Sequence, residues 1–176
     1  MVADNLKTTY MHKNPLVRWF FRTKTNIAIR LADLKKTETI LDFGCGAGWL
    51  KKKLKKKGYN VVGYDITPKY SDVKDYTKIK ANKIFALDVF EHIRKREIKE
   101  ILMNFKKINP NFELIVAIPT ENWVSRKCRK LLGKSEKVSD HITSFKEILK
   151  ILNSQLKLIR KINFLSVSYI AKFKHV

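Results

Sequence analysis

A short segment of alternating glycines contains the residue types in this chain that are best suited to ligand binding. Gly44, Gly46 and Gly48 follow an apolar run, and Asp42 lies two residues before the first of these glycines. Glycines at alternate positions let the backbone approach a ligand where a Cβ would collide. A helix that begins directly after such a turn points its unpaired N–H groups at the same place. The pattern predicts a strand, a ligand-binding turn and a helix, in that order.

A second acid, Asp65, ends the next apolar run, which spans residues 61–65. A nucleotide-like ligand is expected between the two acids, because one carboxylate can accept hydrogen bonds from two ribose hydroxyls. A dinucleotide-binding turn would require a third glycine three residues after Gly46, and this position is Trp49. The sequence therefore argues against a dinucleotide site.

The alternate glycines with an acid two residues ahead resemble motif I of the class I S-adenosylmethionine-dependent methyltransferases. Residues 85–93 are similar to the fourth strand of that family and the D-V-x-E-H turn after it, and residues 114–119 to its fifth strand. Residues 140–145 resemble an H-x-x-x-F segment of the small-molecule branch, which includes quinone-biosynthesis methyltransferases. The likeness covers about residues 36–174, and the order of the motifs makes it specific.

The resemblance implies an S-adenosyl-L-methionine cofactor and assigns residues to it. Gly44, Gly46 and Gly48 would hold the methionine part of the cofactor. Asp42 would orient the amino group, and Asp65 would bind the ribose. The residues expected at the cofactor are Asp42, Gly44, Cys45, Gly46, Gly48, Asp65, Ile66, Asp88 and Val89.

The segment between Asp65 and Asp88 departs from the family pattern. It is too short for the usual third strand and the helix after it, and residues 71–79 are polar and rich in lysine. The family places an acid after the third strand, against the adenine. Asp72 or Asp75 would have to serve here, and the sequence does not decide between them.

Two histidines are the candidate catalytic residues. An imidazole titrates near neutral pH, so His92 or His141 would take a proton from an acceptor hydroxyl or amine. His141 is the better candidate, because His92 is explained equally well as a structural residue of its turn. Asp88, Glu91 and His92 share one turn at the carboxyl edge of the predicted sheet. Three residues in one turn do not define a metal site, so no metal is expected.

Alternating strands and helices predict a Rossmann-like, doubly wound, mostly parallel sheet with a C-terminal antiparallel hairpin and a shortened third-strand region. We expect a cofactor-binding domain over residues 36–176. Residues 1–35 would form a basic, aromatic N-terminal helix that acts as a cap or packs on the sheet. The expected strands are 39–43, 60–65, 83–88, 112–118, 156–164 and 167–173, and the expected helices are 15–34, 47–57, 94–108 and 145–153.

Composition restricts the partners and the compartment. The chain has 176 residues, with 38 Lys and Arg against 16 Asp and Glu, a formal charge of +22. This charge attracts anions such as nucleic acid, acidic lipid or phosphorylated metabolites, although lysine-rich surfaces also arise from thermophilic habit. Two cysteines argue against a disulfide framework. The sequence shows no export signal and no apolar run of ~18 residues, so a cytoplasmic protein is expected.

The function expected from these features is methyl transfer to a small-molecule or lipid-like, anionic acceptor. An RNA methyltransferase and a non-catalytic binding module are the alternatives. The acceptor pocket would be built by the N-terminal helix and residues 120–140, with Glu121 and Trp123 as lining candidates. The basic helix would also permit peripheral membrane contact. The oligomeric state is not specified by the sequence.

Overall fold

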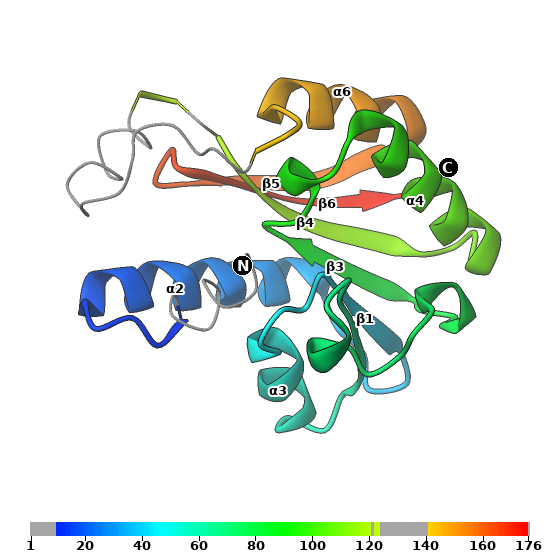
Figure 1. Cartoon of the computed structure of the whole chain (residues 1–176), viewed down its shortest axis with the longest axis horizontal. Helices are drawn as coiled ribbons and strands as arrows, with labels where there is room; N and C mark the ends of the chain where they lie inside the picture. Colours follow the sequence, from blue (N-terminus) through cyan, green and yellow to red (C-terminus); the bar gives the residue numbers. More distant parts are fainter. Residues whose placement is uncertain (1–9, 121, 124–140, 176) are drawn as a thin grey trace.

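The computed structural model describes residues 10–120, 122–123 and 141–175. A six-stranded sheet with the order β2-β1-β3-β4-β6-β5 forms the centre of the molecule (Figure 1). The first four strands in this order are parallel, whereas β6 runs antiparallel to both β4 and β5. The predicted fold class is confirmed. The strands are β1 (Thr39–Phe43), β2 (Asn60–Tyr64), β3 (Lys83–Leu87), β4 (Glu113–Pro119), β5 (Lys157–Phe164) and β6 (Ser168–Lys174).

Helices cover both faces of the sheet, because successive strand residues point to opposite faces. Ile40 of β1 packs in a buried cluster with residues of α2 and α3, and its neighbour Leu41 packs in a second cluster with residues of α4 and α6. The sheet is therefore the middle of three layers (Figure 1). The helices are α2 (Pro15–Ala32), α3 (Trp49–Lys55), α4 (Lys95–Ile108) and α6 (Phe145–Gln155), with 3-10 turns η1 (Pro68–Tyr70), η2 (Tyr76–Lys78) and η3 (Phe90–His92).

The N-terminal helix packs on the sheet through residues of its second half. Ala28 and Leu31 of α2 are buried in the cluster on that side of the sheet. Leu16, in the first turn of the helix, is 69% exposed. The helix ends two residues earlier than expected, since Asp33 takes a left-handed conformation with φ 52°.

Residues 66–82, all of which the structure describes, contain η1 and η2 and no strand. The free edge of β2 is instead hydrogen bonded by Asp72. Its carboxylate accepts the Gly63 N–H at 2.9 Å, and its own N–H donates to the Gly63 carbonyl at 2.8 Å. One acid thus replaces part of the missing strand. No helix in the described ranges is long and apolar enough to cross a membrane.

Candidate functional site

The glycine turn joins β1 to α3 and is anchored to the end of β2. Gly44, Gly46 and Gly48 have φ values of 72°, 47° and 73°, a region that side chains with a Cβ rarely adopt. The N–H groups of Gly44 and Cys45 both donate to the Tyr64 carbonyl, at 2.8 and 3.0 Å. The parallel pairing of β1 and β2 therefore fixes the position of the turn.

The glycine turn also touches the turn that follows β3. A Cβ at Gly44 would lie 2.5 Å from Cγ2 of Val89. This close approach requires glycine at position 44, and it places Val89, one of the residues expected at the cofactor, beside the turn. The carboxyl ends of β1 and β3 meet at this point, where open α/β sheets bind their ligands.

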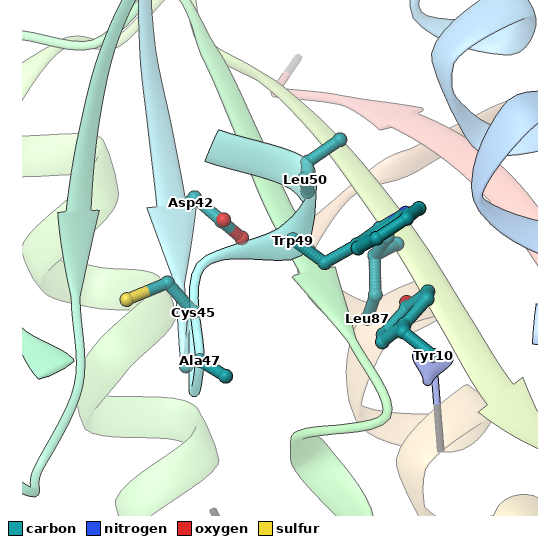
Figure 2. A pocket seen from close by; sticks show the side chains of 8 residues that line it. Tyr10, Asp42, Cys45, Ala47, Trp49, Leu50 and Leu87 are labelled. Carbon is teal, nitrogen blue, oxygen red and sulfur yellow. The ribbon is translucent and has the colours of Figure 1, made fainter. Parts of the chain in front are cut away.

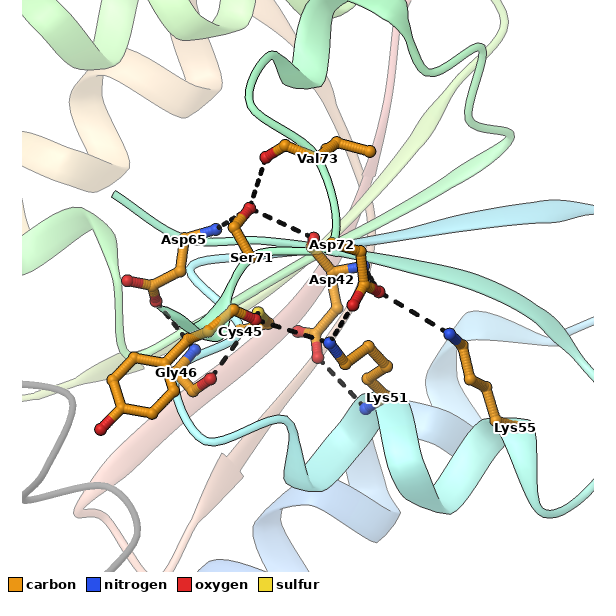
Figure 3. A network of polar contacts seen from close by, with 11 residues as sticks. Asp42, Cys45, Gly46, Lys51, Lys55, Asp65, Ser71, Asp72 and Val73 are labelled. Carbon is orange, nitrogen blue, oxygen red and sulfur yellow. Dashed lines mark hydrogen bonds and ion pairs between the residues drawn. The ribbon is translucent and has the colours of Figure 1, made fainter. Parts of the chain in front are cut away.

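Asp65 connects the two strand ends that carry the predicted acids. One carboxylate oxygen accepts the Gly46 N–H at 2.8 Å (Figure 3). The other oxygen accepts the Thr67 N–H at 2.8 Å. A carboxylate has about four acceptor sites, so hydrogen bonds from a ligand remain possible at this partly exposed residue. The next residue, Ile66, is 89% exposed.

Asp42 is buried behind the turn, with an exposed fraction of 4%. Burial raises its pKa to about 7, although the carboxylate accepts the Lys51 N–H at 3.2 Å. The proton is held because a charged carboxylate loses its hydration in this position. A cationic group placed next to Asp42 would reverse this effect.

Cys45 is a packing residue of the turn. Its thiol is buried, and burial raises its pKa to about 12. Because the thiolate is the reactive form of cysteine, the raised pKa argues against a nucleophilic role for Cys45. This agrees with its position between two motif glycines.

A cavity lies between the glycine turn and the N-terminal segment (Figure 2). The Tyr10 ring stacks on Trp49, with 5.1 Å between centroids and 13° between planes. The Tyr10 hydroxyl is 2.9 Å from the Thr25 hydroxyl of α2. The cavity volume is about 30 Å³, enough to hold water. The lining residues are Tyr10, Asp42, Gly44, Cys45, Ala47, Trp49, Leu50 and Leu87.

Trp49 contributes a hydrogen-bond donor to this region. Its Nε1 atom is buried and has no hydrogen-bond partner among the described residues. The Arg22 guanidinium lies over the same ring, 5.0 Å from its centroid. A buried indole N–H beside a cation can bind an anionic group such as a carboxylate.

Asp88 is engaged by the N-terminal helix. It directly follows β3, has a left-handed φ of 57° and forms an ion pair with Lys24 of α2. The side chains of Lys24 and Asp88 are 3% and 17% exposed. The sequence placed Asp88 at the cofactor but gave no sign of Lys24 as its partner.

The two histidines meet although 49 positions separate them in the sequence. The rings of His92 and His141 are 5.3 Å apart at an angle of 78°. The segment after His141 is fixed to η3 by the N–H groups of Ile142 and Thr143, which donate to the Glu91 carbonyl at 2.7 and 3.2 Å. The structure therefore brings both predicted catalytic residues together beside Glu91.

The candidate adenine acids have other partners. Asp72 accepts a hydrogen bond from Lys51 Nζ at 2.6 Å and holds the edge of β2 (Figure 3). Asp75 accepts the Thr77 N–H at 2.9 Å at the start of η2. Neither acid belongs to the cavity lining. Glu121 and most of the segment 120–140 lie outside the described residues, and Trp123 is 67% exposed.

A sequence model of the family described as "Methyltransferase domain" matches residues 18–171. The chain belongs to this family. A comparison with curated proteins finds no significant match. Family and fold together make this chain a class I methyltransferase with S-adenosylmethionine as its cofactor, which sets aside the alternative of a non-catalytic module.

Solved structures show the same fold. The magnesium protoporphyrin IX methyltransferase ChlM of Synechocystis PCC 6803, crystallised with bound SAH, has a TM-score of 0.67 and 18% identity over 98% of this chain and 94% of that one. A SAM-dependent methyltransferase of Aquifex aeolicus has a TM-score of 0.66 and 16% identity, over 97% and 98% of the two chains. The small RNA methyltransferase HEN1 has a TM-score of 0.61 and 18% identity, over 88% of this chain and 25% of its own.

The residues present fit this cofactor. Gly44, Gly46 and Gly48 have no Cβ, and their positive φ angles give the turn a backbone conformation that other residues rarely adopt. The unpartnered Nε1 of Trp49 offers a donor to a carboxylate. Tyr10 and Lys24 are the residues that sequence reasoning missed, because nothing in a single sequence pairs residues 10 and 24 with residues 49 and 88.

Proposed function

We propose that this methyltransferase transfers a methyl group from S-adenosylmethionine to an anionic small-molecule or lipid-like acceptor. The cofactor would lie across the carboxyl ends of β1 and β2. The arrangement of Asp42, Gly46 and Asp65 around these strand ends is the observation that carries this placement. The similarity to ChlM over almost its whole length supports a small-molecule acceptor, and the net charge of +22 supports an anionic one.

Each part of the cofactor has a candidate partner. The ribose hydroxyls would donate to Asp65, and the adenine would lie against the exposed side chain of Ile66. The amino group would face Asp42, whose buried carboxylate gains its charge when a cation approaches. The carboxylate of the cofactor's methionine part would accept a hydrogen bond from Trp49 Nε1, close to the Arg22 guanidinium.

The cofactor brings the reactivity, since the methyl group of a sulfonium is activated before it binds. A lone pair of the acceptor forms the new bond to the methyl carbon while the carbon–sulfur bond breaks and its electrons remain on sulfur. The protein supplies orientation and excludes water. Tyr10, which stacks on Trp49, would line the methionine end of the cofactor site.

Calorimetric titration with S-adenosylmethionine tests the placement. Asp65→Ala removes two acceptors of a charged group, so we expect affinity to fall by about 10- to 100-fold. Asp75→Ala is the matched control, because Asp75, like Asp65, accepts the backbone N–H two residues after it but makes no bond to the glycine turn. Equal affinities of the Asp65 variant and the wild type would refute the placement.

The charge of +22 also favours an RNA acceptor as a second candidate. The small-molecule proposal is preferred on two observations. The chain matches a quarter of HEN1 but nearly all of ChlM. The turn after β3 reads Asp88-Val89-Phe90-Glu91, without the Asn/Asp-Pro-Pro-aromatic sequence typical of methyltransferases that act on base amines.

A further inference from the structure

Three potential metal ligands converge beside the turn after β3. Glu91, His92 and His141 each have a ligand atom, a carboxylate oxygen or a ring nitrogen, within 4.8 Å of the other two. Glu91 is 2% exposed, and both histidines are partly buried. A carboxylate and two imidazoles are a ligand set that binds divalent transition metals.

The convergence is fixed by backbone hydrogen bonds. The Glu91 carbonyl accepts two N–H groups, from Ile142 at 2.7 Å and Thr143 at 3.2 Å. The Thr143 hydroxyl, which is also buried, donates to the Ile93 carbonyl at 2.6 Å. Three bonds therefore hold the segment that begins with His141 against η3. This arrangement keeps the His141 ring beside the His92 ring.

The distances suit a metal ion after a small adjustment. Metal–ligand bonds of about 2.0–2.2 Å place neighbouring ligand atoms about 3–3.5 Å apart. The three ligand atoms lie within 4.8 Å of one another. Side-chain rotations that move these atoms by about an ångström would bring them to metal-binding distance. We propose that Glu91, His92 and His141 bind one divalent transition-metal ion, such as Zn²⁺ or Mn²⁺, and that its open positions take a hydroxyl oxygen of the methyl acceptor.

The position of the cluster supports a role at the acceptor. Val89 lies against Gly44 of the cofactor turn, and Glu91 follows two residues later in η3. Three protein ligands leave coordination positions open, which is typical of catalytic rather than structural metal sites. The metal site therefore adjoins the turn at which the cofactor is placed.

This part of the inference rests on the proposed function. A hydroxyl bound to a divalent cation loses its proton more readily. The proton passes to solvent, and an oxygen lone pair of the resulting alkoxide or phenolate forms the bond to the methyl carbon. The carbon–sulfur bond breaks, so the positive sulfonium and the negative oxygen become a neutral thioether and an ether. His92 and His141 would then act as ligands rather than as the free bases that the sequence suggested.

Titration of chelator-treated, tag-free protein with Co²⁺ tests the site without any acceptor. We expect one Co²⁺ per chain with a visible d–d absorption band, displaced by Zn²⁺. Glu91→Gln and His141→Asn replace a metal ligand by a neutral side chain of similar size. Each should weaken Co²⁺ binding by more than about 100-fold, because loss of a residue that only hydrogen bonds to a ligand already lowers metal affinity by about 10–100-fold. His175→Asn is the matched control, because His175 lies against Phe112 and Pro110 at the other end of β4.

Circular dichroism shows whether each variant folds, and Thr143→Val provides a second test. It removes only the hydroxyl that positions the segment after His141, so Co²⁺ affinity should fall by about 10-fold. Wild-type protein that binds no Co²⁺, or binds it equally after Glu91→Gln and His141→Asn, would overturn the proposed site. Cofactor affinity measured on the same samples separates the two proposals, because S-adenosylmethionine binding without Co²⁺ binding refutes the metal site alone.

Catechol serves as a hydroxyl probe for the open positions. Added to the Co²⁺-loaded protein, it should shift the d–d band by replacing bound water. An unchanged band would show that the ion is coordinatively closed and would overturn the proposed role toward the acceptor.

Discussion

Burial of Asp42 favours the neutral carboxyl group, whereas its proposed role toward the cofactor's amino group requires the charged carboxylate. Burial raises its pKa to about 7, above the ordinary value of 3.8. The unfolded chain therefore loses this proton at a lower pH than the folded chain does. As a result, the contribution of Asp42 to stability is greatest below about pH 4 and is lost as pH rises to about 7.

Cofactor binding should therefore release a proton from Asp42 below pH 7. The ammonium group of the cofactor favours the carboxylate, so affinity should rise by up to about tenfold per pH unit toward pH 7 and then level off. Calorimetry in buffers of different ionisation enthalpy measures the released proton. Asp42→Asn should bind more weakly and show no such release; a release that persists in this variant would assign it to another group.

Gly44 is a residue whose replacement should destabilise the fold. A Cβ there would meet Val89 Cγ2 at 2.5 Å, in a backbone conformation with φ 72°. Gly58 has a similar φ of 75°, and a Cβ there meets only the end of the Lys36 side chain at 3.4 Å. We expect Gly58→Ala to cost about 1 kcal/mol and Gly44→Ala about 2–4 kcal/mol. Urea denaturation measures both, and equal losses would contradict the close approach.

At the scale of elements, the N-terminal helix is joined to the sheet by charge as well as by apolar packing. Lys24 of α2 is buried, pairs with Asp88 at the end of β3, and lies 4.4 Å from the centroid of the Phe21 ring. The same helix holds Tyr10 through Thr25. Tyr10, which lines the cavity beside the glycine turn, is therefore linked to α2.

Breaking this ion pair should destabilise the domain more than removing both partners. Asp88→Asn keeps the left-handed backbone, which Asn tolerates, but leaves Lys24 buried without its counter-charge, at a cost of about 3–5 kcal/mol. The double variant Lys24→Met, Asp88→Asn should recover most of this loss. Chemical denaturation of the two single variants and the double variant measures the coupling, and strictly additive losses would argue against it.

Charge acts at the scale of the whole molecule. The formal charge of +22 predicts attraction to any polyanion, whether or not it is the methyl acceptor. The run from Lys51 to Lys57 lies on α3 and the turn after it, and Lys51 and Lys55 pair with Asp72. Part of this basic run thus stabilises the fold. Leu16 and Trp19 of α2 are 69% and 53% exposed, and membrane contact through this helix stays a prediction.

Mixed tRNA should bind with an affinity that falls steeply as salt rises, because each phosphate contact releases counterions. If the acceptor is a small molecule, this binding should occur without methyl incorporation into the RNA. Filter binding across a salt series, with labelled S-adenosylmethionine in parallel, measures both. Saturable methylation of the RNA would instead establish the RNA alternative.

Local sequence determined most of the fold and of the cofactor turn. Apolar runs of the right length placed the elements to within a few residues, and the structure shows that Ser144 and Glu147 form a capping box at the start of α6. The absence of a strand in 66–82 also followed from composition. These features depend on interactions between near neighbours, which a single sequence records.

Tertiary structure alone decided which distant side chains meet. Tyr10 on Trp49, Lys24 with Asp88, and His141 beside Glu91 and His92 all depend on how α2 and the segment before α6 return to the sheet. The sequence predicted no metal because it offered three candidates from one turn, whereas the proposed site takes His141 from 49 positions away. Backbone hydrogen bonds from Ile142 and Thr143 create that proximity, and neither spacing nor residue type encodes them.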